Sequence, residues 1–160
     1  MINGSFLLPI INEKYLFLKR DDNGLWEIPG GGYEIAEHDY TKVALRELKE
    51  ETGIILTKKK VQLCAILGQR LKKTISEQYG GIEMGLAFVH CSILYETVTV
   101  TLSDEHTDYR LFTYEEINNE WQTFSSGPLW MFFTYLTFKQ KGKVQEGLLK
   151  DRKIWQGKEY

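Results

Sequence analysis

The stretch WEIPGGGYEIAEHDYTKVALRELKEETGI, residues Trp26–Ile54, places a run of glycines directly before a segment rich in carboxylates. Apolar residues recur at helical spacing over Tyr40–Thr52, which predicts an amphipathic helix. Asp39 is a suitable N-cap for this helix, and Gly53 suits the left-handed position after its last turn. Glycines allow the backbone to bend sharply or to approach a ligand closely. The stretch therefore predicts a shaped glycine loop, Gly30–Gly32, that leads into a capped helix.

The predicted helix carries an acidic face. At about 100° per residue, Glu47, Glu50 and Glu51 fall within a sector of about 100°. Like charges at these spacings destabilise a helix by roughly 0.2–0.5 kcal/mol per pair. A divalent cation would convert this repulsion into coordination, because Mg²⁺ prefers carboxylate oxygens and keeps several waters for substrate phosphate. The face is therefore either a solvated acidic surface or a metal site that handles phosphates. The expected core stripe of the helix comprises Thr41, Ala44, Leu45, Leu48 and Thr52.

Composition indicates an ordinary folded globule. The chain has 160 residues, of which 42% are hydrophobic and 13% aromatic, so we expect one domain over residues 1–160. A net charge of −2 gives no reason to expect duplex nucleic acid as a partner. No basic region precedes FLLPII, and this run is too short to span a bilayer, so we expect a cytoplasmic protein with no membrane partner. Cys64 and Cys91 each lie in an apolar run and are expected to be reduced core thiols.

Segments outside the opening stretch have strand and helix patterns. The strand-like segments are GSFLLPII (4–11) and KYLFLKR (14–20), which form a hairpin, VQLCAILGQRL (61–71), IEMGLAFVHCSIL (82–94), the alternating TVTVTLS (97–103), and YRLFTY (109–114). EEINNEW (115–121) and GPLWMFFTYLTFKQ (127–140) predict helices, the second opened by Pro128 in its first turn. Strands mixed with a few helices predict an α+β fold or a mixed α/β/α sandwich. The final segment, Lys141–Tyr160, is either a tail or an edge element.

The opening stretch resembles the box of the Nudix hydrolases, G-x5-E-x7-R-E-U-x-E-E-x-G-U, where U is aliphatic. Arg46–Ile54, the segment RELKEETGI, matches the second half at every specified position. Gly31 and Glu37 keep the six-residue offset of the first half, and WEIPGG resembles the usual lead-in. The segment SDEHTDYRLFTYEEI (103–117) looks like the family's later strand. The resemblance covers roughly residues 4–120.

The box is one residue too long, because eight residues separate Glu37 from Arg46 instead of seven. Either one residue is inserted after Glu37, or the loop gained a glycine earlier and His38 occupies the glutamate position. We favour Glu37, since a one-residue bulge in a loop costs little and a carboxylate can pair with Arg46.

The resemblance implies a Nudix α/β/α sandwich with a mixed central sheet. It also implies hydrolysis of the pyrophosphate linkage in a nucleoside diphosphate derivative, with Mg²⁺ or Mn²⁺ as cofactor. In this reading Glu50 and Glu51 are the principal metal ligands, Glu47 is a ligand or general base, and Arg46 orients Glu47 or braces the loop through Glu37. The implied metal-binding residues are Glu47, Glu50, Glu51, Glu105 and the carbonyl of Gly30 or Gly31. The implied substrate-binding residues are Arg20, Gly30, Gly31, Gly32 and Glu37.

Three functions are compatible with this resemblance. The favoured one is hydrolysis of a nucleoside triphosphate or related nucleotide. The others are a nucleotide-sugar or dinucleotide pyrophosphatase and a non-catalytic nucleotide-binding module. Such modules usually lose carboxylates of the box, whereas Glu47, Glu50 and Glu51 are retained here. The expected partner is a small nucleotide, and a homodimer is an open alternative to a monomer.

Overall fold

A computed structural model describes residues 2–33, 39–70, 77, 80–81 and 84–139. The strands are β1 (Ile2–Ile11), β2 (Lys14–Arg20), β3 (Trp26–Glu27), β4 (Gly30–Tyr33), β5 (Gln62–Arg70), β6 (Met84–Leu94) and β7 (His106–Phe112). The helices are α1 (Tyr40–Thr52), α3 (Tyr114–Asn119) and α4 (Ser126–Lys139), with short 3₁₀ turns at Lys58–Lys60 and Trp121–Thr123. Within these residues, no helix combines the length and apolar character needed to cross a membrane.

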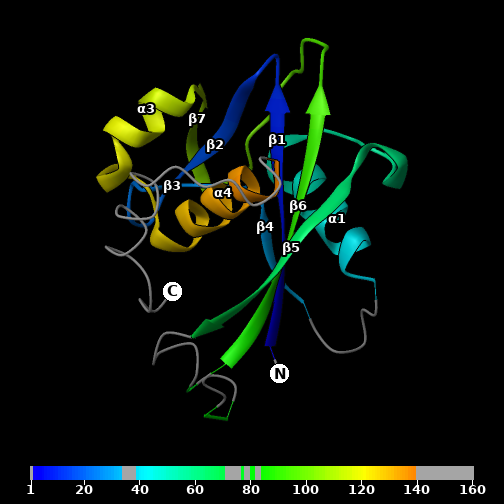
Figure 1. Ribbon diagram of the computed structural model, residues 1–160, viewed down its shortest axis with the longest axis vertical. Helices are drawn as coiled ribbons and strands as arrows, with labels where there is room; N and C mark the ends of the chain where they lie inside the picture. Colours follow the sequence, from blue (N-terminus) through cyan, green and yellow to red (C-terminus); the bar gives the residue numbers. More distant parts are fainter. Residues whose placement is uncertain (1, 34–38, 71–76, 78–79, 82–83, 140–160) are drawn as a thin grey trace.

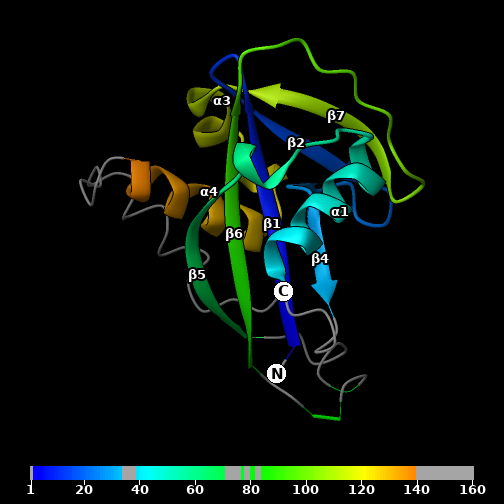
Figure 2. The ribbon, with the colours of Figure 1, turned by 90° about the vertical axis from the view of Figure 1, so that its right-hand side faces the viewer.

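The elements form three layers, with α4 on one face of the sheet and α1 on the other (Figures 1 and 2). The sheet follows the order β3-β2-β1-β6-β5, and β4 and β7 pair with β1 and β2 respectively. β1 runs parallel to β6 over its whole length and antiparallel to β2 and β4. The sheet is therefore mixed, and the expected α/β/α architecture is confirmed. The expected hairpin is confirmed as well, because β1 and β2 are joined at Asn12 and Glu13.

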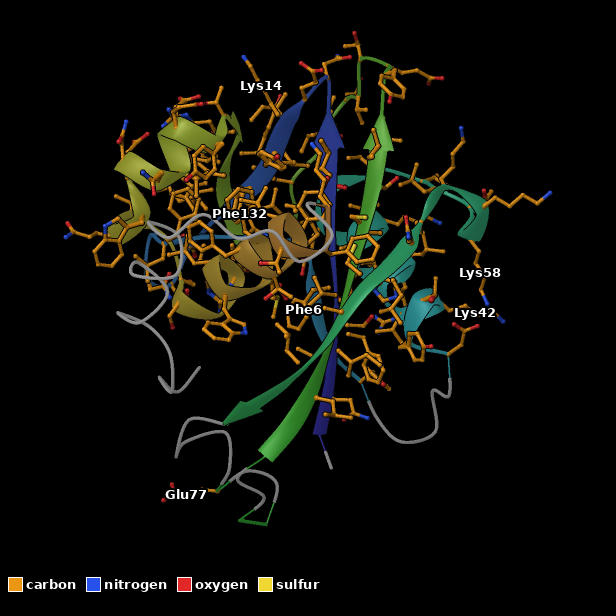
Figure 3. The ribbon with its side chains drawn as sticks, in the orientation of Figure 1. Phe6, Lys14, Lys42, Lys58, Glu77 and Phe132 are labelled. Carbon is orange, nitrogen blue, oxygen red and sulfur yellow. The ribbon has the colours of Figure 1, made fainter. Side chains whose placement is uncertain are left out.

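Each face of the sheet has its own core. On the α4 face, Phe132 packs edge-on against Tyr15 with ring centroids 4.8 Å apart. Figure 3 shows Phe6 and Phe132 on this side of the sheet. On the opposite face, Leu48 of α1 joins Leu7 and Leu16, and all three side chains are fully buried. Alternation along β1 and β2 thus supplies both cores, since successive strand residues point to opposite faces.

Helix α1 has the boundaries that its capping residues predict. The Asp39 side chain accepts hydrogen bonds from the backbone N–H groups of Thr41 and Lys42. Gly53 adopts a left-handed φ of 74°, and its N–H donates to the carbonyl of Lys49 at 2.9 Å. The start and the end of the helix that carries the carboxylates are therefore both set by local sequence.

The N-terminus of α1 is also tied to the sheet by polar contacts. Ser5 Oγ on β1 donates to the carbonyl of Tyr40 at 2.5 Å. The buried His90 on β6 lies 3.2 Å from Thr41 Oγ1 through Nε2 and 3.0 Å from the carbonyl of Phe6 through Nδ1. Burial lowers the pKa of His90, which favours the neutral ring. His90 is therefore a structural residue that ties β6 to β1 and α1.

The strand expected at residues 97–103 is absent. This segment forms no strand, although Val98, Val100 and Leu102 pack against the α1-side core. Thr101 N–H donates to the carbonyl of Thr52 at 2.8 Å, so the segment closes over the end of α1 and joins no strand ladder. Alternation correctly predicted which side chains face the core, but partial burial of one side does not require a strand partner.

The glycine segment is a strand and not the expected loop. Gly30–Tyr33 form β4, which pairs with residues 3–6 of β1. Gly30 has a φ of 156°, and a Cβ there would lie 2.4 Å from Phe6 Cδ1 and 2.6 Å from the carbonyl oxygen of Ser5. The close backbone approach that the sequence predicted is therefore real, but it is made to β1. Glu37, His38 and Lys141–Tyr160 lie outside the described residues.

Replacing Asp39 tests the cap of α1. We expect Asp39→Ala to lower the free energy of unfolding by about 1 kcal/mol, because two backbone N–H groups lose their acceptor. Asp39→Asn retains an acceptor and loses only the surface ion pair with Lys58, so it should remain within about 0.5 kcal/mol of the wild type. Urea denaturation measures both, and an equal loss in the two variants would show that the ion pair, not the cap, matters.

Candidate functional site

The site is built around Glu51, in the last turn of α1. Its side chain turns beneath β4, and the residue is only 5% exposed. Gly30 N–H points at Glu51 Oε2 across 3.3 Å. The described residues give Glu51 no ion pair with Lys or Arg. A buried carboxylate with one weak backbone donor is poorly compensated, because burial penalises the charged form.

Glu47 lies one turn earlier and faces the next glycine. A Cβ on Gly31 would stand 3.0 Å from the Glu47 carboxylate, so this glycine leaves the room that the carboxylate occupies. Arg46 Nη1 lies 3.1 Å from Glu47 Oε1 and 3.3 Å from both carboxylate oxygens of Glu50. The contact with Glu47 agrees with the orienting role that the resemblance implies for Arg46.

The three helix carboxylates differ in exposure. Glu51 is buried, the Glu47 side chain is 14% exposed and the Glu50 side chain 56%. The sequence placed all three on one face, and the structure turns that face partly against β4, with Glu50 at its outer edge. A cation bound under the glycine strand would meet Glu51 and Glu47 first.

The carboxylates of this cluster disfavour one another's charged forms. Burial raises the pKa of Glu51 to about 9, and the charges of Glu27, Glu47 and Glu105 add to the rise. Burial also raises the pKa of Glu47, with Arg46 opposing the rise and Glu50 and Glu105 supporting it. Desolvated carboxylates of one sign favour protonation or a bound cation.

Glu27 is a member of this cluster that the sequence analysis did not select. It stands on β3, two residues before Pro29, and its charge is the largest Coulombic influence on Glu51. Its Oε1 lies 2.8 Å from Nε2 of the buried His106, and its Oε2 lies 3.0 Å from Nη1 of Arg20. The glutamate of WEIPGG, in a strand next to the glycines, was the available signal. Its partner His106 is far away in sequence.

The remaining predicted residues lie around this cluster. Arg20 ends β2 and is held by Asp22 and Glu27, with two contacts of 2.7 Å to Asp22. Glu105 precedes β7, and its carbonyl accepts from Asp21 N–H at 2.9 Å. Gly32 pairs with Gly4 of β1. His106, next to Glu105, is buried and hydrogen-bonded to Glu27.

The carboxylates fit a hard divalent cation by chemistry and by charge. Mg²⁺ and Mn²⁺ take carboxylate and carbonyl oxygens, which Glu47, Glu51 and the glycines of β4 supply. Such an ion would neutralise the buried charge of Glu51. In the described residues, no three His, Cys, Asp or Glu side chains are already close enough together to hold an ion. Coordination would thus need the carboxylates to draw together, with substrate or water completing the shell.

A sequence model of the NUDIX domain matches residues 1–136, which is most of the chain and contains every residue of this cluster. The chain belongs to the Nudix hydrolase family. A MutT-like protein of Streptomyces ambofaciens is 54% identical to this Nudix protein over 41 residues. That alignment spans 26% of each chain.

Solved structures with a similar fold belong to proteins with different names. A MutT protein from Methanosarcina mazei Go1 has a TM-score of 0.66 at 22% identity, with 89% of this chain and 96% of that chain covered. An Ap4A hydrolase of C. elegans has a TM-score of 0.64 at 16% identity, covering 88% and 99%. The E. coli dihydroneopterin triphosphate pyrophosphohydrolase has a TM-score of 0.64 at 16% identity, covering 86% and 92%. At these identities the similarity shows the Nudix fold and leaves the substrate undetermined.

The raised pKa of Glu51 predicts how stability depends on pH in metal-free buffer. Glu51 binds its proton more tightly in the folded chain, where the pKa of its carboxyl is about 9, than in the unfolded chain, where a glutamate has its ordinary pKa of 4.5. Its stabilising contribution is therefore complete below the unfolded pKa and is lost as pH rises through the folded pKa. Glu51→Gln has no such loss, so at pH 8 it should be more stable than the wild type by on the order of 1 kcal/mol or more. The gap should close towards pH 4.5.

Thermal denaturation with EDTA at a series of pH values measures this difference. Glu50→Gln is the matched control, because the Glu50 side chain is 56% exposed and one turn from Arg46. Its stability should follow that of the wild type across the series. A Glu51→Gln variant that is less stable than the wild type at pH 8 would mean that the Glu51 charge supports the fold.

Proposed function

We propose that this Nudix protein hydrolyses the pyrophosphate linkage of a nucleoside diphosphate derivative with the help of Mg²⁺ or Mn²⁺. The preferred substrate class is a nucleoside triphosphate or a related nucleotide. The single observation that carries the proposal is the buried Glu51 carboxylate, which lies beside Glu47 and under Gly30 with no Lys or Arg paired to it in the described residues. A functional cation explains this otherwise unfavourable burial.

The chain's own residues have distinct proposed roles. Glu51 and Glu47 would hold the ion, with Glu50 reaching it from the exposed edge. When bound, the ion would neutralise phosphate charge and lower the pKa of a water molecule. Arg46 keeps the Glu47 carboxylate in place through its 3.1 Å contact. Glu47, whose pKa is raised by burial, is suited to accept a proton from the attacking water.

Residues at the edge of the cluster are proposed to orient the substrate. Arg20 carries positive charge at the end of β2, 3.0 Å from Glu27, and is 40% exposed. It can therefore turn part of its guanidinium towards phosphate oxygens. The N–H groups of β4 that do not pair with β1 offer further donors of the kind that bind phosphate. Glu105 is proposed as a distal ligand or base, because its charge influences both Glu47 and Glu51.

A triphosphate substrate is favoured because the sequence has no proline about fifteen residues past the box, where related nucleotide-sugar enzymes tend to have one. The tyrosine that related dinucleoside polyphosphate enzymes tend to have there is missing as well. The structural neighbours include both an Ap4A hydrolase and a triphosphate pyrophosphohydrolase, so the same fold serves both classes. A dinucleotide pyrophosphatase is the second candidate.

A nucleotide panel with a metal series tests the proposal. We expect release of phosphate or pyrophosphate from at least one nucleoside triphosphate, dependent on Mg²⁺ or Mn²⁺ and lost with EDTA. Glu51→Gln and Glu50→Gln should each lower kcat by roughly 100-fold or more, because ligands of the ion are removed. Manganese binding, followed by the electron paramagnetic resonance signal of free Mn²⁺, should weaken in Glu51→Gln as well.

Glu96→Gln is the matched control, since Glu96 is exposed on the segment after β6 and is not among the charges that shift the pKa of Glu47 or Glu51. It should retain wild-type kcat and Mn²⁺ affinity. Turnover that is undiminished after thorough chelation would contradict the metal dependence. Hydrolysis of dinucleoside polyphosphates or nucleotide sugars in preference to every triphosphate would instead establish the second candidate.

A further inference from the structure

Two cysteines that do not belong to the carboxylate cluster lie side by side on the sheet. Cys64 Sγ on β5 is 2.9 Å from Cys91 Sγ on β6. Both are free thiols. This separation is shorter than the ordinary contact between two unbonded sulfur atoms, and only a small further approach would bring them to bonding distance. The sequence analysis treated them as two independent core thiols.

A β-bulge places Cys64 next to Cys91. β5 and β6 are antiparallel, with Gln62 opposite Cys91 and Ala65 opposite Val89, and the register shifts between Leu63 and Ala65. Cys64 is the extra residue and has no Cα partner. Bulges of this kind re-aim a side chain, and here Cys64 turns to the same α4-side core that contains Cys91.

The two thiols differ in solvent exposure and in the direction in which their pKa values are shifted. Cys91 is 5% exposed, whereas Cys64 is only partly buried. The Cys64 thiol also lies 3.6 Å from the carbonyl of Gln62. Hydrogen bonding from Cys64 lowers the pKa of Cys91, and burial opposes this shift. A thiolate is the reactive form of cysteine, so the pair has a nucleophile and a neighbour in place to complete a bond.

We infer that Cys64 and Cys91 form an oxidation site for hydroperoxides, at which an intrachain disulfide links β5 to β6. The Cys91 thiolate attacks one oxygen of hydrogen peroxide, the O–O bond breaks, and Cys91 becomes a sulfenic acid. Cys64 sulfur then attacks Cys91 sulfur, the S–O bond breaks, and water leaves. In total, two thiols and one hydrogen peroxide give one S–S bond and two waters, with the thiols oxidised and the peroxide reduced.

The disulfide would join an edge strand of the sheet, β5, to its neighbour β6. β5 is the terminal strand of the order β3-β2-β1-β6-β5, so among the described strands it pairs only with β6. A link between Cys64 and Cys91 would fasten this strand to β6 near Tyr135 of α4. The pKa of Tyr135 is raised by burial and by the nearby charges of Tyr15, Cys91 and Cys64. A cross-link also restricts the unfolded chain, so the oxidised protein should have the higher melting temperature. None of this depends on the hydrolytic activity.

Oxidation of the full chain with hydrogen peroxide tests the inference. Reduced protein is treated under native conditions and, in parallel, in denaturant. We expect both thiols to disappear in the native protein at least about tenfold faster than in denaturant, because the fold holds them together. Mass spectrometry should find a peptide pair linked through Cys64 and Cys91 with the mass of two hydrogens lost, and dithiothreitol should restore two thiols.

Single substitutions separate this pair from ordinary thiol oxidation. In Cys64→Ser the remaining Cys91 should be trapped as a sulfenic acid by dimedone, and no intrachain link should form. Cys91→Ser should react slowly and leave Cys64 a thiol. The melting temperature should rise on oxidation in the wild type and in neither variant. If a serine variant does not fold, the comparison of native and denatured wild type still decides. Equal rates in the two states, or thiols that survive in the native protein, would overturn the inference.

Discussion

The carboxylate of Glu51 lies buried under the backbone of Gly30, and the other features of the site depend on this contact. A helix can place an acidic side chain under a strand only if that strand approaches closely. β4 does so because its residues lack side chains where they meet β1 and α1, as the clash distances at Gly30 and Gly31 demonstrate. The packing of β4 against β1 and the packing of β4 against α1 therefore depend on each other. A side chain added at Gly30 would displace β1 before it reached the carboxylates.

This contact costs stability, and the rest of the fold offsets that cost. Glu27, Glu47, Glu51 and Glu105 repel one another across the cluster. The helix that presents two of them is nevertheless held firmly at its start by Asp39, Ser5 and His90, at its end by Gly53, and along its inner side by the core around Leu48. Local strain at one site within an otherwise consistent structure is the usual signature of function. A bound cation would remove the repulsion and leave the supports unchanged.

Much of the fold was predictable because local rules govern it. The boundaries of α1 follow from Asp39 and Gly53, and the β1–β2 hairpin follows from alternation on either side of a turn. The alternation rule failed at residues 97–103, where it correctly indicated that Val98 and Val100 pack against the core but could not indicate that the segment lacks a strand partner. The glycines were correctly expected to permit close approach, but sequence could not specify that the approaching element is β1.

The shared face of the α1 carboxylates was predictable from the sequence, and the burial of Glu51 was not. At about 100° per residue, Glu51 falls at the boundary between the acidic face and the core stripe of α1. Whether a side chain at that boundary is buried depends on how β4 lies over α1. Glu27 was missed because its partners Arg20 and His106 come from β2 and β7, and only the folded sheet brings them together. Pairing across 79 residues leaves no spacing signal. The proximity of Cys64 to Cys91 likewise depends on a bulge that composition cannot indicate.

The function proposed for the site requires that the charge buried at Glu51 is matched by a divalent cation. A crystal structure of the protein with Mn²⁺, with anomalous diffraction recorded at the manganese absorption edge, is the decisive measurement. We expect an anomalous peak under β4 within coordination distance of the Glu51 and Glu47 carboxylates. A peak elsewhere on the molecule, with the Glu51 carboxylate uncoordinated and unchanged beneath Gly30, would contradict it.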